Sequence, residues 1–333
     1  MNNLIPLYII LPLATAFLTP ILGRLIRGFP KALLSLVLLF LTVITMISIF
    51  QGVDQPRTYQ VGGWEPVNGI PIGIYMVFDG LSALILLIIS LIGFLATFYS
   101  ISYIKKYTAE NNFYALLALM ITGMNGVVLT GDLFNLYVFL EIAVIASYAL
   151  VAFGVEKGEL EASFKYQVLG GIASLLILLS IGLLYWQTKT LNMADTRQLI
   201  GNATNSTFLV FTQILLFSGF GLKAAMIPFH AWLPDAHSSA PSPISAMLSG
   251  VLIKAIGIYA ILRIFFNMFA ITYEISVLLT TIGTLSMIIG GLLAIAQWDM
   301  KRMFAYSSIS QMGYVAIGIG IGMMLLATDS NRS

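Results

Sequence analysis

The sequence predicts an all-α integral membrane protein with about ten transmembrane helices. Of its 333 residues, 59% are hydrophobic and only 9% are charged, and the mean hydropathy is +0.96. This composition lies far outside the range of a soluble domain with one core. Apolar runs of about 20 residues, the length needed to cross the hydrocarbon of a bilayer, recur between polar or Gly- and Pro-rich breaks. We therefore expect the chain to reside in the lipid bilayer.

Cutting the chain at these breaks gives ten expected spans. They lie near 4–23, 32–50, 76–100, 113–131, 133–153, 166–186, 207–227, 243–266, 274–297 and 303–326. The first begins at Leu4 without a preceding basic stretch, which indicates a retained span and not a removed signal. Two connections are long. The segment 51–75 is rich in Gly and Pro and could form a small hairpin cap, and we expect 187–206 to be a polar loop.

The distribution of Lys and Arg over the loops predicts the orientation of the chain. One side receives nine of them: Arg24, Arg27, Lys31, Lys105, Lys106, Lys157, Lys165, Lys301 and Arg302. The other side receives five: Arg57, Lys189, Arg197, Arg263 and Arg332. Because cytoplasmic loops carry the excess of positive charge, we expect the nine-charge side to be cytoplasmic and the N-terminus to lie outside.

Composition excludes several classes of function. The formal net charge is only +2, so no basic field predicts a nucleic-acid partner. The absence of cysteine excludes disulfides, thiolate zinc sites, iron–sulfur ligation and a cysteine nucleophile on this chain. The sequence contains no nucleophile–base motif, phosphate-binding loop or metal-ligand cluster. We therefore expect no cofactor and no enzymatic activity of the chain by itself.

Three ionisable residues fall inside apolar spans. They are Glu141, Lys223 and Lys254, and Glu141 lies about nine residues, or roughly 13 Å, into its helix. Such groups cost roughly 2.5 kcal/mol or more each at mid-membrane, so they are candidates for a functional site. Gly221 and Pro228 bracket Lys223 and predict a local break in its helix.

These charges are suited to passing protons. Burial alone disfavours the ionised forms of Lys and Glu, whereas a neighbouring opposite charge restores both. A proton that reaches one partner therefore disturbs the next, along a chain of Glu141, Lys223 and Lys254. The alternative is that the charges pair only to fix helix packing. Two lysines and one carboxylate cannot neutralise each other fully, which favours a moving proton.

Both histidines, His230 and His237, lie in the stretch PFHAWLPDAHSSAPSP. Imidazole titrates near neutral pH and can relay protons, and Asp235 and the neighbouring serines can order water. We expect a relay or gate here, with capping at the membrane interface as the alternative. A zinc site is the weakest interpretation, because the spacing of seven suits no standard helical pair and only Asp235 is close as a third ligand.

Three further features predict local structure. Asp79 and Asp132 each stand immediately before an apolar run, and we expect each to cap the helix that follows. Gly318 and Gly322 have the small-xxx-small spacing of closely packed helices, so we expect them to contact a neighbouring helix.

Three strings carry the charged residues: GDLFNLYVFLEIAVIASYALVAFG, GLKAAMIPFHAWLPDAHSSAPSPISAMLSGVLIKAIGIYAILR and QWDMKRMFAYSSISQMGYVAIG. In this order they resemble the antiporter-like subunits of complex I, of Mrp-type multisubunit sodium/proton antiporters and of membrane-bound energy-converting hydrogenases. The resemblance covers most of the chain from residue 76 onward. LNMAD at 191–195 is similar to the Mrp D-type subunit and its hydrogenase relatives.

The resemblance implies roles for five residues. Glu141 and Lys223 would form the pair of the first half-channel, and Lys254 would be the bridging lysine. The loop with His230 and His237 would follow a broken seventh helix.

The resemblance also implies how the chain is organised. Residues 1–112 would hold N-terminal helices 1–3, residues 113–270 the first five-helix translocation repeat, helices 4–8, and residues 271–333 helices 9–10 of a partial second repeat. Relatives usually have about fourteen spans in two inverted repeats. We therefore expect that a second half-channel comes from another polypeptide or has been lost.

The expected function is the translocation of protons, or of protons coupled to sodium, in the inner cell membrane. The chain would be a membrane subunit of a multisubunit respiratory or antiporter complex, a class that includes membrane-bound oxidoreductases of the hydrogenase or NADH dehydrogenase type. Its partners would be other membrane subunits, H⁺ and, in the coupled case, Na⁺. One alternative is a structural subunit that keeps the charges without net ion transport, and another is a stand-alone carrier for a small anion.

Overall fold

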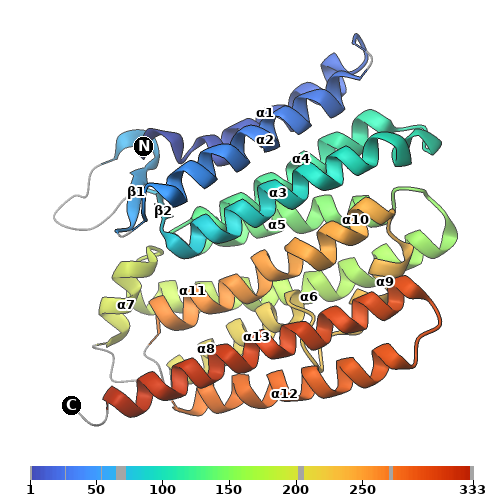
Figure 1. Ribbon diagram of the computed structural model, residues 1–333. Coiled ribbons are helices and arrows are strands. Elements are labelled where there is room, and N and C mark those ends of the chain that lie inside the picture. The colour runs from blue at the N-terminus through green and yellow to red at the C-terminus, as the bar shows by residue number, and fades with distance from the viewer. Residues whose placement is uncertain are drawn as a thin grey trace. The chain divides into compact units, whose positions relative to one another are not determined.

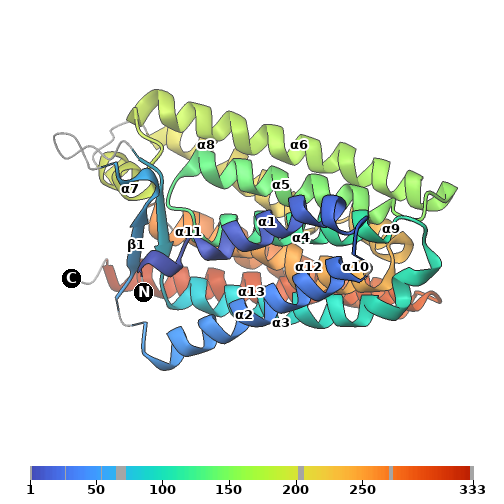
Figure 2. The same ribbon diagram turned by 90° about the horizontal axis from the view of Figure 1, so that it is seen from above.

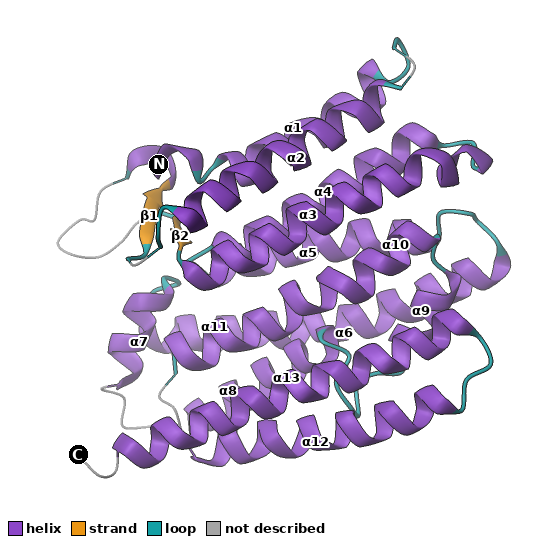
Figure 3. Cartoon of the chain, viewed as in Figure 1, coloured by secondary structure: helices purple, strands orange, loops and turns teal. Residues whose placement is uncertain are grey.

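The computed structural model describes residues 2–26, 28–53, 55–64, 73–201, 206–269 and 273–330. Figure 3 shows that this part of the chain consists of helices joined by loops, with one short β-hairpin. The chain divides into two compact units, Met1–Ser163 with Ala240–Leu252, and Phe164–Ser239 with Ile253–Ser333. We describe each unit by itself.

Eight helices in the described ranges are long and apolar enough to cross a membrane, and two further apolar helices are shorter. The expected all-α membrane fold is therefore confirmed. Nine of the ten are α1 Leu7–Leu22, α2 Phe29–Phe50, α3 Gly80–Tyr103, α4 Glu110–Leu129, α5 Leu133–Val151, α6 Lys157–Thr188, α8 Ser206–Lys223, α12 Tyr273–Ile295 and α13 Met300–Ser330. The tenth runs over Ser242–Asn267. It contains α10 Ser242–Met247, the π-helical turns η4 Leu248–Leu252 and η5 Lys254–Ile258, and α11 Tyr259–Asn267.

In the first unit, a β-hairpin connects α2 to α3. Strands β1 Arg57–Gln60 and β2 Tyr75–Phe78 pair antiparallel, close to the N-terminus (Figure 2). The hairpin expected in this connection is confirmed, although β2 delays the start of α3 to Gly80. Asp79 then forms a capping box with Ser82, and Asp132 accepts from the amide of Asn135 at 2.7 Å. Both predicted helix caps are therefore confirmed.

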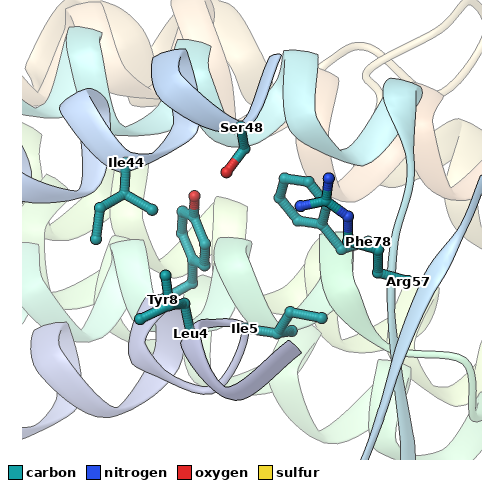
Figure 4. Close-up of a pocket in the computed structure, with 7 residues that line it drawn as sticks. All are labelled: Leu4, Ile5, Tyr8, Ile44, Ser48, Arg57 and Phe78. Atoms are coloured by element: carbon teal, nitrogen blue, oxygen red, sulfur yellow. The ribbon is translucent and has the colours of Figure 1, made fainter. Parts of the chain in front are cut away.

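A polar contact compensates for a proline inside α1. Pro12 has no N–H, so the carbonyl of Tyr8 lacks its helical donor, and the side-chain amide of Asn125 on α4 donates to it at 2.7 Å. The Tyr8 hydroxyl bonds to that of Thr45 on α2 at 2.8 Å. Figure 4 shows the hydroxyls of Tyr8 and Ser48 directed toward one small pocket beside Arg57. Its volume of about 10 Å³ is the size of one water molecule, so it is a packing feature and not a ligand site.

One expectation for the second unit is wrong. The segment 187–206, predicted to be a loop, contains helix α7, Met193–Gly201. The side chain of Asn192 accepts from the amides of Ala194 at 3.0 Å and Asp195 at 3.3 Å, which caps the helix. The buried residues of α7 are Met193, Thr196 and Ile200. They have helical spacing, but most residues of the segment are polar, so the sequence was interpreted as a loop.

Helices α12 and α13 form a closely packed pair in the second unit (Figure 1). A Cβ added to Gly313 would lie 2.4 Å from the amide nitrogen of Met287, and one added to Gly320 would lie 2.3 Å from the Thr280 hydroxyl. A Cβ added to either of the predicted contact residues, Gly318 and Gly322, would meet no other part of the described chain within 4 Å. That prediction is wrong, because Gly313 and Gly320 are two turns apart and share the face toward α12, from which the other two glycines are rotated away.

This packing makes a prediction. Gly313→Ala should destabilise the purified protein by about 1–3 kcal/mol, because the added methyl meets the backbone of α12 and forces the helices apart. Thermal unfolding in detergent measures the effect. Gly318→Ala on the same helix is the matched control and should be at least as stable as the parent protein, because Ala favours the helix and its methyl meets nothing. Equal stability of both variants would contradict the packing described here.

Candidate functional site

The structure places the intramembrane charges at three kinds of position. Glu141 is the ninth of the 19 residues of α5, and Lys254 is the thirteenth of the 26 residues of the span Ser242–Asn267, so each lies midway along its helix. Lys223 is the last residue of α8. Glu141 belongs to the first unit, whereas Lys223 and Lys254 belong to the second.

Glu141 lies in the wall of an open hollow of the first unit, formed by α4 and α5. The hollow has a volume of about 410 Å³. Its other lining residues are apolar or aromatic: Leu116, Leu119, Tyr137, Val138, Ile142, Ile145 and Ala146. The side chain of Glu141 is half-buried there. The arrangement places a carboxylate at mid-helix in the wall of an otherwise apolar hollow.

Lys223 is held against α6. Its side chain is only 2% exposed, and its ammonium donates to the carbonyl of Gly170 at 3.0 Å and to the hydroxyl of Ser174 at 2.9 Å. Both acceptors are electrically neutral, so they solvate the charge without cancelling it. The two bonds satisfy two of the three N–H donors of the ammonium.

The chain leaves the helix directly after Lys223, as the glycines and Pro228 predicted. Ala225 adopts φ = 53°, the left-handed conformation that often ends a helix, and the amide of Met226 donates to the carbonyl of Gly221 at 3.0 Å. The indole N–H of Trp232 donates to the carbonyl of Leu222 at 2.9 Å. The backbone groups at the buried end of α8 are therefore hydrogen-bonded to other protein groups, as an apolar environment requires.

Lys254 is the first residue of the π-helical turn η5. Only Ile253 separates it from the preceding π-helical turn, η4. π-Helical turns are rare and occur frequently at functional sites. Three residues after Lys254, a Cβ added to Gly257 would lie 2.6 Å from the Cα of Ala224. The helix of Lys254 therefore touches the backbone that follows Lys223, and the structure brings the two lysine-bearing segments together at this point.

The two histidines lie in and just before the short helix α9, Trp232–Ser239, outside the ten spans. His237 is 4% exposed, and burial, together with the nearby charge of Lys301, lowers its pKa to about 4. His237 is therefore neutral at pH 7. The ring of His230 lies 6.3 Å from that of Tyr306 on α13.

Salt bridges fasten α9 to two other helices of the second unit. Asp235 accepts from Arg302 on α13 at 2.7 Å and from Lys165 on α6 at 3.2 Å. The ammonium of Lys301 donates to the carbonyl of Ser238 at 3.3 Å. Asp235 therefore joins α9 to α6 and α13, and its expected role in ordering water stays a prediction.

The sequence identified the ionisable residues but missed their partners. Gly170, Ser174 and Trp232 were not predicted, because a backbone carbonyl, a hydroxyl in an apolar helix and an indole carry no motif. The only available signal was the presence of polar atoms in spans that are otherwise apolar. The pairing of Glu141 with Lys223 stays a prediction.

Comparison with known proteins gives consistent matches. A family model described as NADH:quinone oxidoreductase/Mrp antiporter, TM, matches residues 130–328, and one described as NADH-ubiquinone oxidoreductase (complex I), chain 5 N-terminus, matches residues 64–114. The first of these models alone covers more than half of the chain.

Individual relatives agree with the family models. The chain is 36% identical over 328 residues to NADH-quinone oxidoreductase subunit N of Desulforudis audaxviator, and 34% identical over 331 residues to the D-type Na⁺/H⁺ antiporter subunit of Alkalihalophilus pseudofirmus. In both cases 96% of this chain aligns and spans 64% of the relative. The fold is similar to a chain of the membrane-bound sulfane sulfur reductase, an archaeal respiratory membrane complex, with a TM-score of 0.86, 34% identity and coverage of 97% of this chain and 67% of that one.

The site geometry also makes a prediction. Trp232→Phe should lower the stability of the purified protein by about 1 kcal/mol, because the end of α8 loses the indole donor to Leu222. The phenyl ring can still stack on Tyr166, whose ring centroid lies 4.2 Å from that of Trp232. Thermal unfolding in detergent checks this. Trp298→Phe is the control, since Trp298 is fully exposed, and it should leave the transition temperature unchanged.

Proposed function

The chain belongs to the NADH:quinone oxidoreductase/Mrp antiporter transmembrane family, and from that premise we propose that it translocates protons, alone or in exchange for sodium. It would act as a membrane subunit of a multisubunit respiratory or antiporter complex. The chemistry that drives transport would lie on other subunits. The relatives support this proposal by name, since one is a quinone oxidoreductase subunit and another a sodium/proton antiporter subunit.

The observation that carries the proposal is the setting of Lys223. Its ammonium is buried, held by two neutral oxygens and placed where an apolar helix breaks. An ammonium has donors and no acceptor, so it cannot bind a sodium ion, and what it passes on is a proton.

The remaining site residues suggest a route. Glu141, at its open hollow, would exchange protons with Lys223, and Lys254 would receive them next, since its helix touches the break after Lys223. His230 and His237 would relay or gate protons near the end of the second unit. The loop charges support an orientation with the N-terminus outside and the basic side in the cytoplasm.

A structural subunit is the second candidate. The bonds from Lys223 to α6 and from Asp235 to Lys165 and Arg302 are also what a scaffold would use to fix its helices. On this view the charges persist for assembly, and the complex that contains the chain moves ions by another route.

Charge removal at the two central residues tests the proposal. Glu141→Gln and Lys223→Met keep the shape of each side chain and remove its charge. In the complex purified with this chain and placed in liposomes, each should reduce proton transport per assembled complex by about 100-fold or more, a typical contribution of a proton-transfer group. A pH-sensitive dye measures the transport.

The controls use the same substitutions at exposed sites. Glu274→Gln and Lys157→Met alter exposed residues at the starts of α12 and α6 and should leave transport unchanged. If Glu141→Gln and Lys223→Met impair assembly but leave flux per assembled complex intact, the structural candidate is correct and the proposed function is wrong.

A further inference from the structure

Helix α12 reaches the break at the end of α8 through one buried hydroxyl. The backbone N–H of Ile227 donates to Oγ of Ser286 at 3.0 Å, across 59 positions of sequence. Ser286 is fully buried and is the fourteenth of the 23 residues of α12. A polar group at mid-helix in a membrane span needs a partner, and here that partner is a backbone amide.

Within the break, the backbone N–H of Ile227 donates to a side chain of another helix. The neighbouring amides donate to backbone carbonyls of α8 or of the turn: Ala224 to Phe220, Ala225 to Leu222, Met226 to Gly221 and Phe229 to Met226. Pro228 has no N–H to donate. The bond from Ile227 to Ser286 therefore completes the hydrogen bonding of the break, and it does so from a distant helix.

Ser286 lies on α12, which packs closely against α13. The next residue on α12, Met287, accepts at its carbonyl from the hydroxyl of Ser310 on α13, at 2.9 Å. The amide nitrogen of Met287 also lies 2.4 Å from where a Cβ added to Gly313 of α13 would be, so the two backbones pack closely at this point. The backbone around Ser286 is thus tied to α13, so a displacement of the α12–α13 pair would carry the hydroxyl with it.

We infer that Ser286 is a positioning residue for Lys223. Lys223 and Ile227 are the two ends of one tight turn, so holding the amide of Ile227 also holds the lysine against Gly170 and Ser174. The consequence for transport rests on the proposed function. Through this bond, a movement of α12 and α13 would change how Lys223 is held and with it the rate of proton transfer.

The experiment compares Ser286→Ala with Ser276→Ala in the purified complex. Ser276 is also fully buried on α12, but its hydroxyl bonds to the Tyr273 carbonyl of its own helix, at 2.6 Å. The first measurement is the rate of reductive methylation of Lys223, determined by mass spectrometry relative to the exposed Lys157. We expect this rate to rise about five-fold in Ser286→Ala, the effect of losing one buried hydrogen bond, and to stay unchanged in Ser276→Ala.

The second measurement is proton transport per assembled complex in liposomes. It should fall about five-fold in Ser286→Ala and stay unchanged in Ser276→Ala. Ser286→Thr keeps the hydroxyl acceptor and should restore both the methylation rate and the transport rate. If Ser286→Ala does not assemble, Ser286→Cys takes its place, because it keeps the volume and weakens the acceptor.

The two measurements separate the two ideas. Unchanged methylation of Lys223 in Ser286→Ala overturns the positioning role, whatever the transport rate. So does a loss of assembly with normal methylation and transport in the complexes that remain. A third outcome is faster methylation of Lys223 in Ser286→Ala, with normal transport both in that variant and in Lys223→Met. It supports the positioning role and contradicts the proposed function.

Discussion

A helix that ends among apolar side chains must satisfy its terminal carbonyls and the amides that follow, and two other helices of the second unit supply groups for this at the end of α8. Helix α8 ends at Lys223, and the groups that complete the hydrogen bonding come from Trp232 on α9 and Ser286 on α12. An unsatisfied backbone group in such surroundings costs several kcal/mol. The break can therefore exist only where these helices meet it, which fixes the position of the lysine at its start.

The first unit solves the same problem without a break. Pro12 removes one helical bond from α1, and Asn125 on α4 replaces it with a side-chain donor to Tyr8. Asp79 and Asp132 satisfy the first amides of α3 and α5. Here the substitutes leave the helices continuous, so the unit keeps Glu141 in the middle of an unbroken α5, whereas the second unit places Lys223 at a helix end.

The sequence predicted the fold well because the features that determine it depend on residues that are close in the sequence. Apolar length sets the spans, and an Asp before an apolar run caps a helix. The all-α membrane fold, both caps, the hairpin, the break and the antiporter-like family were therefore predicted correctly, and of the ten expected spans eight are helices of membrane-crossing length and two are shorter apolar helices. The errors concern rotation and tertiary contact. Whether Gly313 or Gly318 faces α12 depends on how α13 turns about its axis, and Gly170 serves Lys223 through a backbone carbonyl that every residue possesses. No residue type signals either choice.

The kinds of partner that the cations have suggest how the second unit separates structure from transport. At the middle of α9, Arg302 and Lys165 bind the carboxylate of Asp235, so in these bonds both partners are ionised. The two bonds described for Lys223 go to neutral oxygens. A carboxylate stabilises the charged form of its partner and so opposes loss of the proton. Neutral acceptors oppose it less, and they hold the ammonium in place through geometry that depends on the turn ending at Ile227. In the second unit the carboxylate of Asp235 therefore fastens three helices together, and the position of the buried lysine depends on the turn that ends at Ile227.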